Sequence, residues 1–84
     1  PDDQAAALMT LVRQQAAEVL GYHDTDEIQP ELSFKELGFD SLLGVDLRNR
    51  LNAVTGLRLP AEVVIQNPTP ELLVGFIRSR LAQS

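Results

Sequence analysis

The sequence contains no cysteine, a single histidine and no long apolar run. The absence of cysteine excludes disulfides, thiolate catalysis, iron–sulfur clusters and cysteine-ligated zinc, and it suits a reducing compartment. No apolar stretch approaches the roughly 20 residues that span a bilayer, and the N-terminus lacks the basic and apolar regions of a signal peptide. We therefore expect a cytoplasmic protein that does not associate with membranes.

Basic residues are also scarce. Seven of them stand against twelve acidic residues, which gives a net charge of −5 and argues against a nucleic-acid partner. With 84 residues, 44% of them hydrophobic, the chain predicts one small domain, residues 1–84, that folds around a single core and is monomeric. Because it starts at Pro1 without an initiator Met, we expect it to be a segment cut from a longer protein.

The charge is unevenly distributed. Residues 24–46, called here the acidic segment, hold seven acidic residues and only one basic residue, Lys35, for a net charge of −6. Residues 47–84 have a net charge of +3. The acidic segment is either a solvated loop or a docking surface for basic partners.

Apolar spacing predicts two long helices in the first two thirds of the chain. One covers residues 4–20, with Asp2 or Asp3 as N-cap and Gly21 just past its end. The other covers residues 41–55, between the N-cap Asp40 and Gly56. Its apolar stripe comprises Leu43, Leu47, Leu51 and Val54.

A third long helix begins at Pro70, which follows the N-cap Thr69. Its predicted apolar face comprises Leu72, Leu73, Phe76, Ile77 and Leu81. Residues 60–65 are ambiguous because their β-branched run also suits a strand, but no second strand is available and a short helix is favoured. The capping-box spacing from Ser33 to Glu36 predicts one further helical turn within an ordered loop, ended by Gly38. The predicted fold is all-α, a small bundle of three longer helices and one short helix.

The residues for catalysis are missing. His23 is the only candidate base, and no serine stands in a G-x-S-x-G motif. Residues 24–35 fail as a calcium loop because Gln29 occupies the position that requires glycine and Lys35 the position of the bidentate Glu. We therefore expect a protein that is not an enzyme.

Ser41 stands out by its position. It is predicted at the first turn of a helix, inside the acidic segment, where unpaired N–H groups and the helix dipole would favour a phosphate ester. An isolated Asp-Ser-Leu is nevertheless an ordinary helix start.

The surrounding sequence is more specific. ELGFDSL at 36–42, VDLRNRL at 45–51, TGLRLP at 55–60 and PTP at 68–70 resemble acyl carrier protein domains, most closely those of modular type I polyketide synthases. The resemblance covers essentially the whole chain. It implies that 4′-phosphopantetheine, taken from coenzyme A, is attached to Ser41 and tethers acyl or polyketide intermediates as thioesters. The aspartate before the serine resembles the pattern of acyl carriers, whereas peptidyl carriers more often have glycine at that position.

The resemblance also implies partners: a phosphopantetheinyl transferase, a ketosynthase, an acyltransferase and other synthase domains. By the same resemblance, Asp40 helps the transferase hold its magnesium ion. Two stretches, Leu43-Gly44 and residues 65–67, depart from the pattern on surfaces where such carriers meet their enzymes, so they bear on partner choice.

Helical geometry predicts where partners dock. At about 100° per residue, one side of the helix over 41–55 points away from its apolar stripe. The predicted docking residues there and in the adjoining acidic segment are Glu36, Asp40, Leu42, Val45, Asp46 and Asn49. The alternative function is a small helical adaptor that docks a basic partner through its acidic face and carries no prosthetic group.

Overall fold

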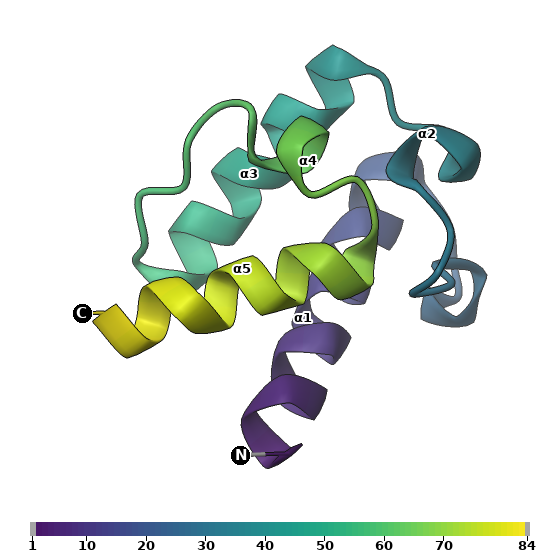
Figure 1. Cartoon of the computed structure of the whole chain (residues 1–84). Helices are drawn as coiled ribbons and strands as arrows, with labels where there is room; N and C mark the ends of the chain where they lie inside the picture. Colours follow the sequence, from purple (N-terminus) through teal and green to yellow (C-terminus); the bar gives the residue numbers. More distant parts are fainter. Residues whose placement is uncertain (1, 84) are drawn as a thin grey trace.

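The computed structural model describes residues 2–83, without the side chain of Asp2, and shows a bundle of helices (Figure 1). The long helices are α1 (Asp2–Leu20), α3 (Ser41–Thr55) and α5 (Pro70–Gln83). Two four-residue helices, α2 (Phe34–Leu37) and α4 (Val63–Gln66), lie in the connections, and a 3-10 turn covers Thr25–Glu27. The all-α prediction is confirmed, and within the described residues no helix is long and apolar enough to cross a membrane.

Helix ends follow the predicted local signals closely. The bounds of α3 agree with the prediction, since Asp40 caps its start and Gly56 ends it with φ +75°. Thr69 caps α5, because its Oγ1 accepts from the Leu72 N–H at 3.1 Å. α1 begins at Asp2, two residues earlier than predicted, so the expectation that Asp3 is its N-cap is wrong. The side chain of Asp2, the other expected cap, lies outside the described part.

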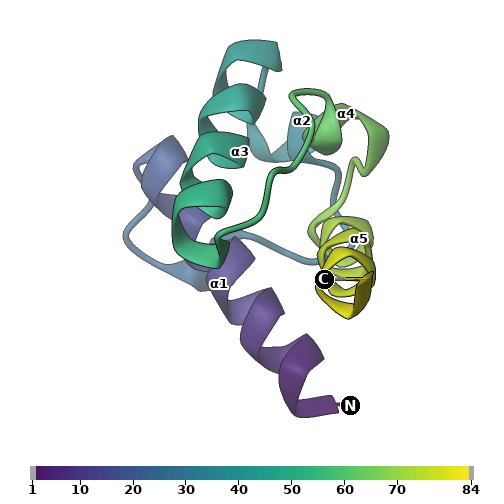
Figure 2. The same ribbon diagram turned by 90° about the vertical axis from the view of Figure 1, so that its left-hand side faces the viewer.

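The core forms where α1, α3 and α5 meet. Figures 1 and 2 show α5 crossing α1, while the first turns of α1 project beyond the other helices. Leu47 and Leu51 are fully buried, as expected from the α3 stripe. The largest fully buried side chains are Val12, Ile28, Leu47, Leu51, Val63, Pro70, Leu73 and Ile77.

Two apolar residues predicted on buried faces are instead exposed. Val54 is 50% exposed and Leu72 is 54% exposed, so these two assignments are wrong. In α5 the buried face runs through Leu73, Val74 and Ile77, which turns Leu72 outward. Periodicity identifies a helix face, but the extent of the neighbouring helices decides how much of it is covered.

The long connection between α1 and α3 is ordered, as predicted. Ile28, Phe34, Leu37 and Phe39 from this connection are all buried in the core. The Phe34 and Phe39 rings meet edge to face, with centroids 5.3 Å apart. Their packing holds α2 against the bundle and so fixes the approach of the chain to α3.

Candidate functional site

The start of α3 presents Ser41 to solvent. Asp40 Oδ1 accepts from the Leu43 N–H at 2.8 Å, and the Gly44 N–H donates to the Asp40 carbonyl at 2.9 Å. These two bonds satisfy the third and fourth N–H groups of the helix and leave those of Ser41 and Leu42 without an acceptor among residues 2–83. The Ser41 side chain is exposed, and its hydroxyl makes no hydrogen bond to another described residue. The hydroxyl is therefore accessible for modification.

A reciprocal cap orders the turn before α3. Ser33 Oγ accepts from the Glu36 N–H at 3.0 Å, and Glu36 Oε2 accepts from the Ser33 N–H at 3.0 Å, which confirms the predicted capping box. Gly38 then reverses the chain with φ +115°, a conformation that favours glycine. The Phe39 N–H closes the turn on the Phe34 carbonyl at 2.8 Å. The direction of the chain into Ser41 is thus fixed by hydrogen bonds.

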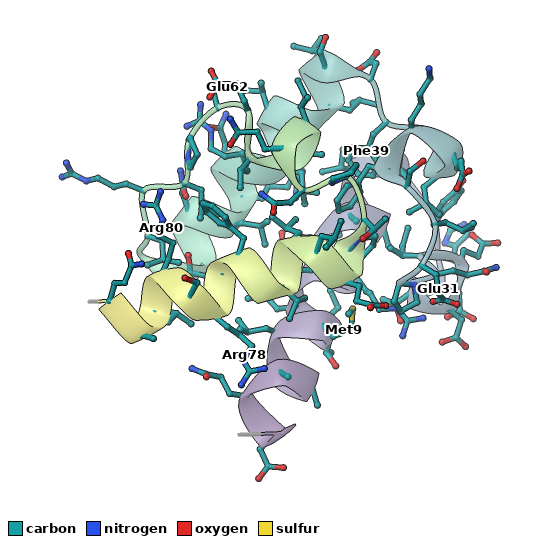
Figure 3. The ribbon with its side chains drawn as sticks, in the orientation of Figure 1. Met9, Glu31, Phe39, Glu62, Arg78 and Arg80 are labelled. Carbon is teal, nitrogen blue, oxygen red and sulfur yellow. The ribbon has the colours of Figure 1, made fainter. Side chains whose placement is uncertain are left out.

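An apolar hollow of about 400 Å³ opens beside Ser41. Its walls come from α2, from the start of α3 and from α4 with the residues that follow it. The lining residues are Ser33, Phe34, Lys35, Phe39, Asp40, Ser41, Gly44, Val64, Ile65 and Pro68. Figure 3 shows Phe39 between α2 and α4. Sequence reasoning did not find this hollow, because three of its ten lining residues lie more than 20 positions after Ser41.

Gly44 lines the hollow where α3 faces α4. A Cβ atom at this buried position would lie 3.5 Å from Val64 Cβ and Cγ1, an ordinary van der Waals distance. The hollow is therefore wider by one methyl group than it would be with alanine at this position.

The predicted docking residues extend from the turn before α3 and its first residues to Asn49, just past the middle of that helix. Leu42 is 75% exposed, and Asp46 and Asn49 are also exposed, whereas Val45 is only partly exposed. Across the hollow, Ile65 on α4 is 66% exposed. Sequence reasoning did not place Ile65 at this surface, although the departure at residues 65–67 marked the segment.

Several carboxylates of the acidic segment form hydrogen bonds or ion pairs within the domain. The carboxylates of Asp24, Glu36 and Asp40 each accept a backbone N–H at a turn or helix start, and Asp26 pairs with Arg13 at 3.5 Å. The carboxylates of Glu36 and Asp40 are thereby oriented toward backbone N–H groups. Within residues 2–83, no three His, Asp or Glu side chains gather as metal ligands.

One basic residue, Arg50, forms ion pairs beside the predicted docking residues. Asp46 pairs with Arg50 at 3.7 Å, and Arg50 also approaches Glu18 of α1 at 3.4 Å. Arg50 therefore offsets part of the negative charge on α3, so the acidic surface is concentrated toward Ser41.

Comparison with known proteins identifies the family. The family described as "phosphopantetheine attachment site" matches residues 10–77. The spectinabilin polyketide synthase system protein NorA′ of Streptomyces orinoci is 57% identical over 81 residues, which are 96% of this chain and 2% of that protein. The pikromycin polyketide synthase component PikAII of Streptomyces venezuelae is 51% identical over 82 residues, 98% of this chain and 2% of that protein. The chain thus spans only a small fraction of these relatives.

A solved structure shows the same fold. The A1-type ACP domain from module 5 of MLSA1 superposes with a TM-score of 0.86 at 40% identity, covering 93% of this chain and 78% of that one. The family match covers most of the sequence, and the structural match covers most of both chains. The chain therefore belongs to the phosphopantetheine-attachment family, as an acyl carrier domain whose covalent cofactor is 4′-phosphopantetheine.

Proposed function

We propose that Ser41 is the attachment serine and that the domain presents acyl groups on it to the enzymes of a polyketide synthase. The main support for this proposal is the position of Ser41. It is the exposed first residue of a 15-residue helix, its hydroxyl makes no hydrogen bond to another described residue, and it lies beside an apolar hollow. The other described serines lack these features. The Ser33 hydroxyl is engaged in the capping box, and Ser79 lies in the middle of α5.

The residues around Ser41 fit the group. A phosphodiester on the Ser41 oxygen would face the N–H groups of Ser41 and Leu42 and the positive end of the α3 dipole. Lys35, the only basic residue of the acidic segment, lines the same hollow and supplies a compensating positive charge. The Asp40 carboxylate is held by the Leu43 N–H, which restrains it on the helix.

The residues of the chain hold the attachment serine and its arm in an exposed position. When bound, 4′-phosphopantetheine supplies a thiol on a long flexible arm, and acyl groups are carried on it as thioesters. Asp40 fixes the first turn of α3 so that Ser41 remains at its tip. Phe39, Val64 and Ile65 form an apolar wall of the hollow. The aliphatic part of the arm next to Ser41 can pack against this wall and be shielded from water. No side chain at this site is proposed to act as an acid, base or nucleophile toward the cargo.

Docking to partners uses the surface next to Ser41. We propose that a phosphopantetheinyl transferase, and then the ketosynthase and acyltransferase of the synthase, contact Leu42, Val45, Asp46 and Asn49. Exposed Leu42 supplies an apolar centre, and the acidic residues around it, Glu36, Asp40 and Asp46, match basic partner surfaces. This contact is small and screened by salt, which suits rapid engagement and release. The proposed setting is a monomeric carrier unit of a larger cytoplasmic synthase.

The adaptor alternative, in which the same acidic face docks a partner without a prosthetic group, is less well supported. Family membership rests on an attachment site, and the hollow beside Ser41 has no role in an adaptor.

Loading with coenzyme A tests the proposal. In this step the Ser41 oxygen bonds to phosphorus, the pyrophosphate linkage of coenzyme A breaks, the hydroxyl proton is lost and the nucleotide part leaves. With a phosphopantetheinyl transferase, the parent and the control Ser79→Ala should each gain one phosphopantetheine by intact mass, while Ser41→Ala should gain none. Circular dichroism should show that both variants are folded, because both side chains are exposed. Modification of Ser41→Ala, or mapping of the group to another residue, would refute the assignment.

A further inference from the structure

A second pocket lies at the opposite end of α3 from Ser41. It has a volume of about 220 Å³ and is lined by Leu57, Arg58 and Leu59, which follow α3, and by Arg80 and Gln83 of α5. Figure 1 shows the last turns of α5 beside the beginning of the loop that leaves α3. At 1.5 Å per residue, the 15 residues of α3 separate the two ends by about 22 Å. The pocket shares no residue with the proposed attachment site.

The two arginines of this pocket have no carboxylate partner among residues 2–83. The ion pairs of that part of the chain involve Arg13 and Arg50. The Arg80 guanidinium lies 4.9 Å from the centroid of the Phe76 ring, a contact that positions the cation without neutralising it. Two exposed guanidinium groups therefore border one pocket.

Nearby acidic residues are few. Residues 47–84 contain only Glu62 and Glu71 as acids, against five arginines. Figure 3 shows Glu62 at the far end of the loop, away from Arg80, and Glu71 lies in the first turn of α5, at the other end of that helix. The positive charge at the pocket is thus left for a ligand outside the described residues.

Hydrogen bonds hold the loop side of the pocket in place. The Leu59 N–H donates to Asn52 Oδ1 at 2.8 Å, and the Leu57 N–H donates to Thr55 Oγ1 at 3.2 Å. Leu59 is 4% exposed and anchors the loop in the core, while Leu57 is partly exposed. The pocket therefore combines two cationic donors with a fixed, partly apolar wall, a preorganised arrangement that lowers the cost of binding.

We propose that this pocket docks an acidic peptide segment of a partner protein, with one carboxylate between Arg58 and Arg80 and an apolar side chain against Leu57. The guanidinium forks match carboxylates geometrically, and the leucine wall matches the aliphatic part of such a segment. A nucleic acid fits less well, because the net charge of the domain is −5. Binding here leaves the Ser41 end open, so the domain can be held at one end while enzymes use the other.

Nuclear magnetic resonance titration of the ¹⁵N-labelled domain provides the test. The probe is the peptide acetyl-Glu-Glu-Leu-Glu-Glu-amide, and its glutamine counterpart is the control. We expect the acidic peptide to shift amide signals at residues 57–59 and 80–83, and Arg58→Ala and Arg80→Ala each to raise the Kd roughly fivefold. Arg78→Ala is the matched control, because Arg78 has the same charge and lies on the same helix but does not line the pocket; Figure 3 shows it directed toward α1. Its Kd should change less than about twofold.

Three results would overturn the proposal. The first is shifts spread over the surface without a maximum at the pocket. The second is an equal loss of affinity in Arg78→Ala, which would show attraction by net charge alone. The third is equal binding of inorganic tripolyphosphate at the same amides, which would show a general anion site instead of a peptide site. Because Arg58 lies outside the helices and is exposed, Arg58→Ala tests the pocket even if Arg80→Ala disturbs α5.

Discussion

Replacing Gly44 with alanine should stabilise the domain. Alanine is favoured over glycine within a helix by about 0.5–1 kcal/mol, because glycine loses more backbone entropy on folding. The new methyl group would meet Val64 at 3.5 Å in a buried position, which adds roughly 0.8 kcal/mol of apolar burial. The free energy of unfolding should therefore rise by about 1–2 kcal/mol, and each 1 kcal/mol corresponds to a melting temperature about 4–8 °C higher in a domain of this size.

Gly75 provides a matched control for this substitution. It lies within α5, and a Cβ atom there would meet nothing within 4 Å, so Gly75→Ala should give only the backbone part, about 0.5–1 kcal/mol. Urea denaturation of the three proteins, compared at equal m-values, measures both effects. If Gly75→Ala is stabilising while Gly44→Ala leaves the midpoint unchanged or lowers it, the α3 and α4 backbones are too close for a methyl group. Gly44 would then be required for packing beside the hollow.

Other substitutions test the core, the cap and the docking face. Leu51→Ala should lower the free energy of unfolding by about 2–5 kcal/mol because Leu51 is fully buried, whereas Val54→Ala should cost less than about 1 kcal/mol because Val54 is half exposed; equal costs in denaturant would contradict the packing described. Ser33→Ala should cost about 1 kcal/mol by removing one half of the capping box, and an unchanged thermal midpoint would show that the cap contributes nothing. Leu42→Ala should lower kcat/KM for coenzyme A-dependent loading by about tenfold, equivalent to about 1.4 kcal/mol, while the domain remains folded. Asp46→Lys should slow loading and reduce its dependence on salt, and loading rates equal to those of the parent at every salt concentration would exclude this docking face.

The secondary structure was predictable where short-range chemistry determines it. Asp40 and Gly56 mark the two ends of α3 in the sequence, and the structure uses both as caps. Ser33 and Glu36 are three residues apart, the spacing that the capping box requires, and both of its hydrogen bonds form. The 3-10 turn at Thr25–Glu27 was missed, although Asp24 caps it by a local bond of the same kind.

Burial was less predictable because it depends on partners distant in the sequence. Val54 has the spacing of the α3 stripe but lies near the end of the helix, where packing no longer covers it. Val74 is buried and Leu72 is exposed, although both are apolar, because the face that α5 turns to the core runs through Leu73 and Ile77. Hydrophobicity alone does not distinguish such residues.

In the candidate site, too, the features set by nearby residues were predictable and those set by distant residues were not. The exposure of Ser41 follows from its place at a helix start, which the sequence indicates. The hollow beside it does not, because Val64, Ile65 and Pro68 reach that place only through the packing of α4 against α3. The resemblance to acyl carrier domains supplied the role expected of Ser41, and the structure supplied the surroundings.

The distribution of charge along α3 would orient the domain toward the basic partners proposed above. The acidic segment leads into the Ser41 end, Arg50 forms ion pairs with Glu18 and Asp46 further along the helix, and Arg58 follows its other end. A basic partner surface therefore attracts the end that carries Ser41 and repels the end at Arg58, which favours productive encounters before any contact forms. Because this steering acts over about a Debye length, roughly 8 Å at physiological salt, it orients the domain without a large apolar interface. Fast release is then compatible with correct presentation of the arm, which a carrier visiting several enzymes in turn requires.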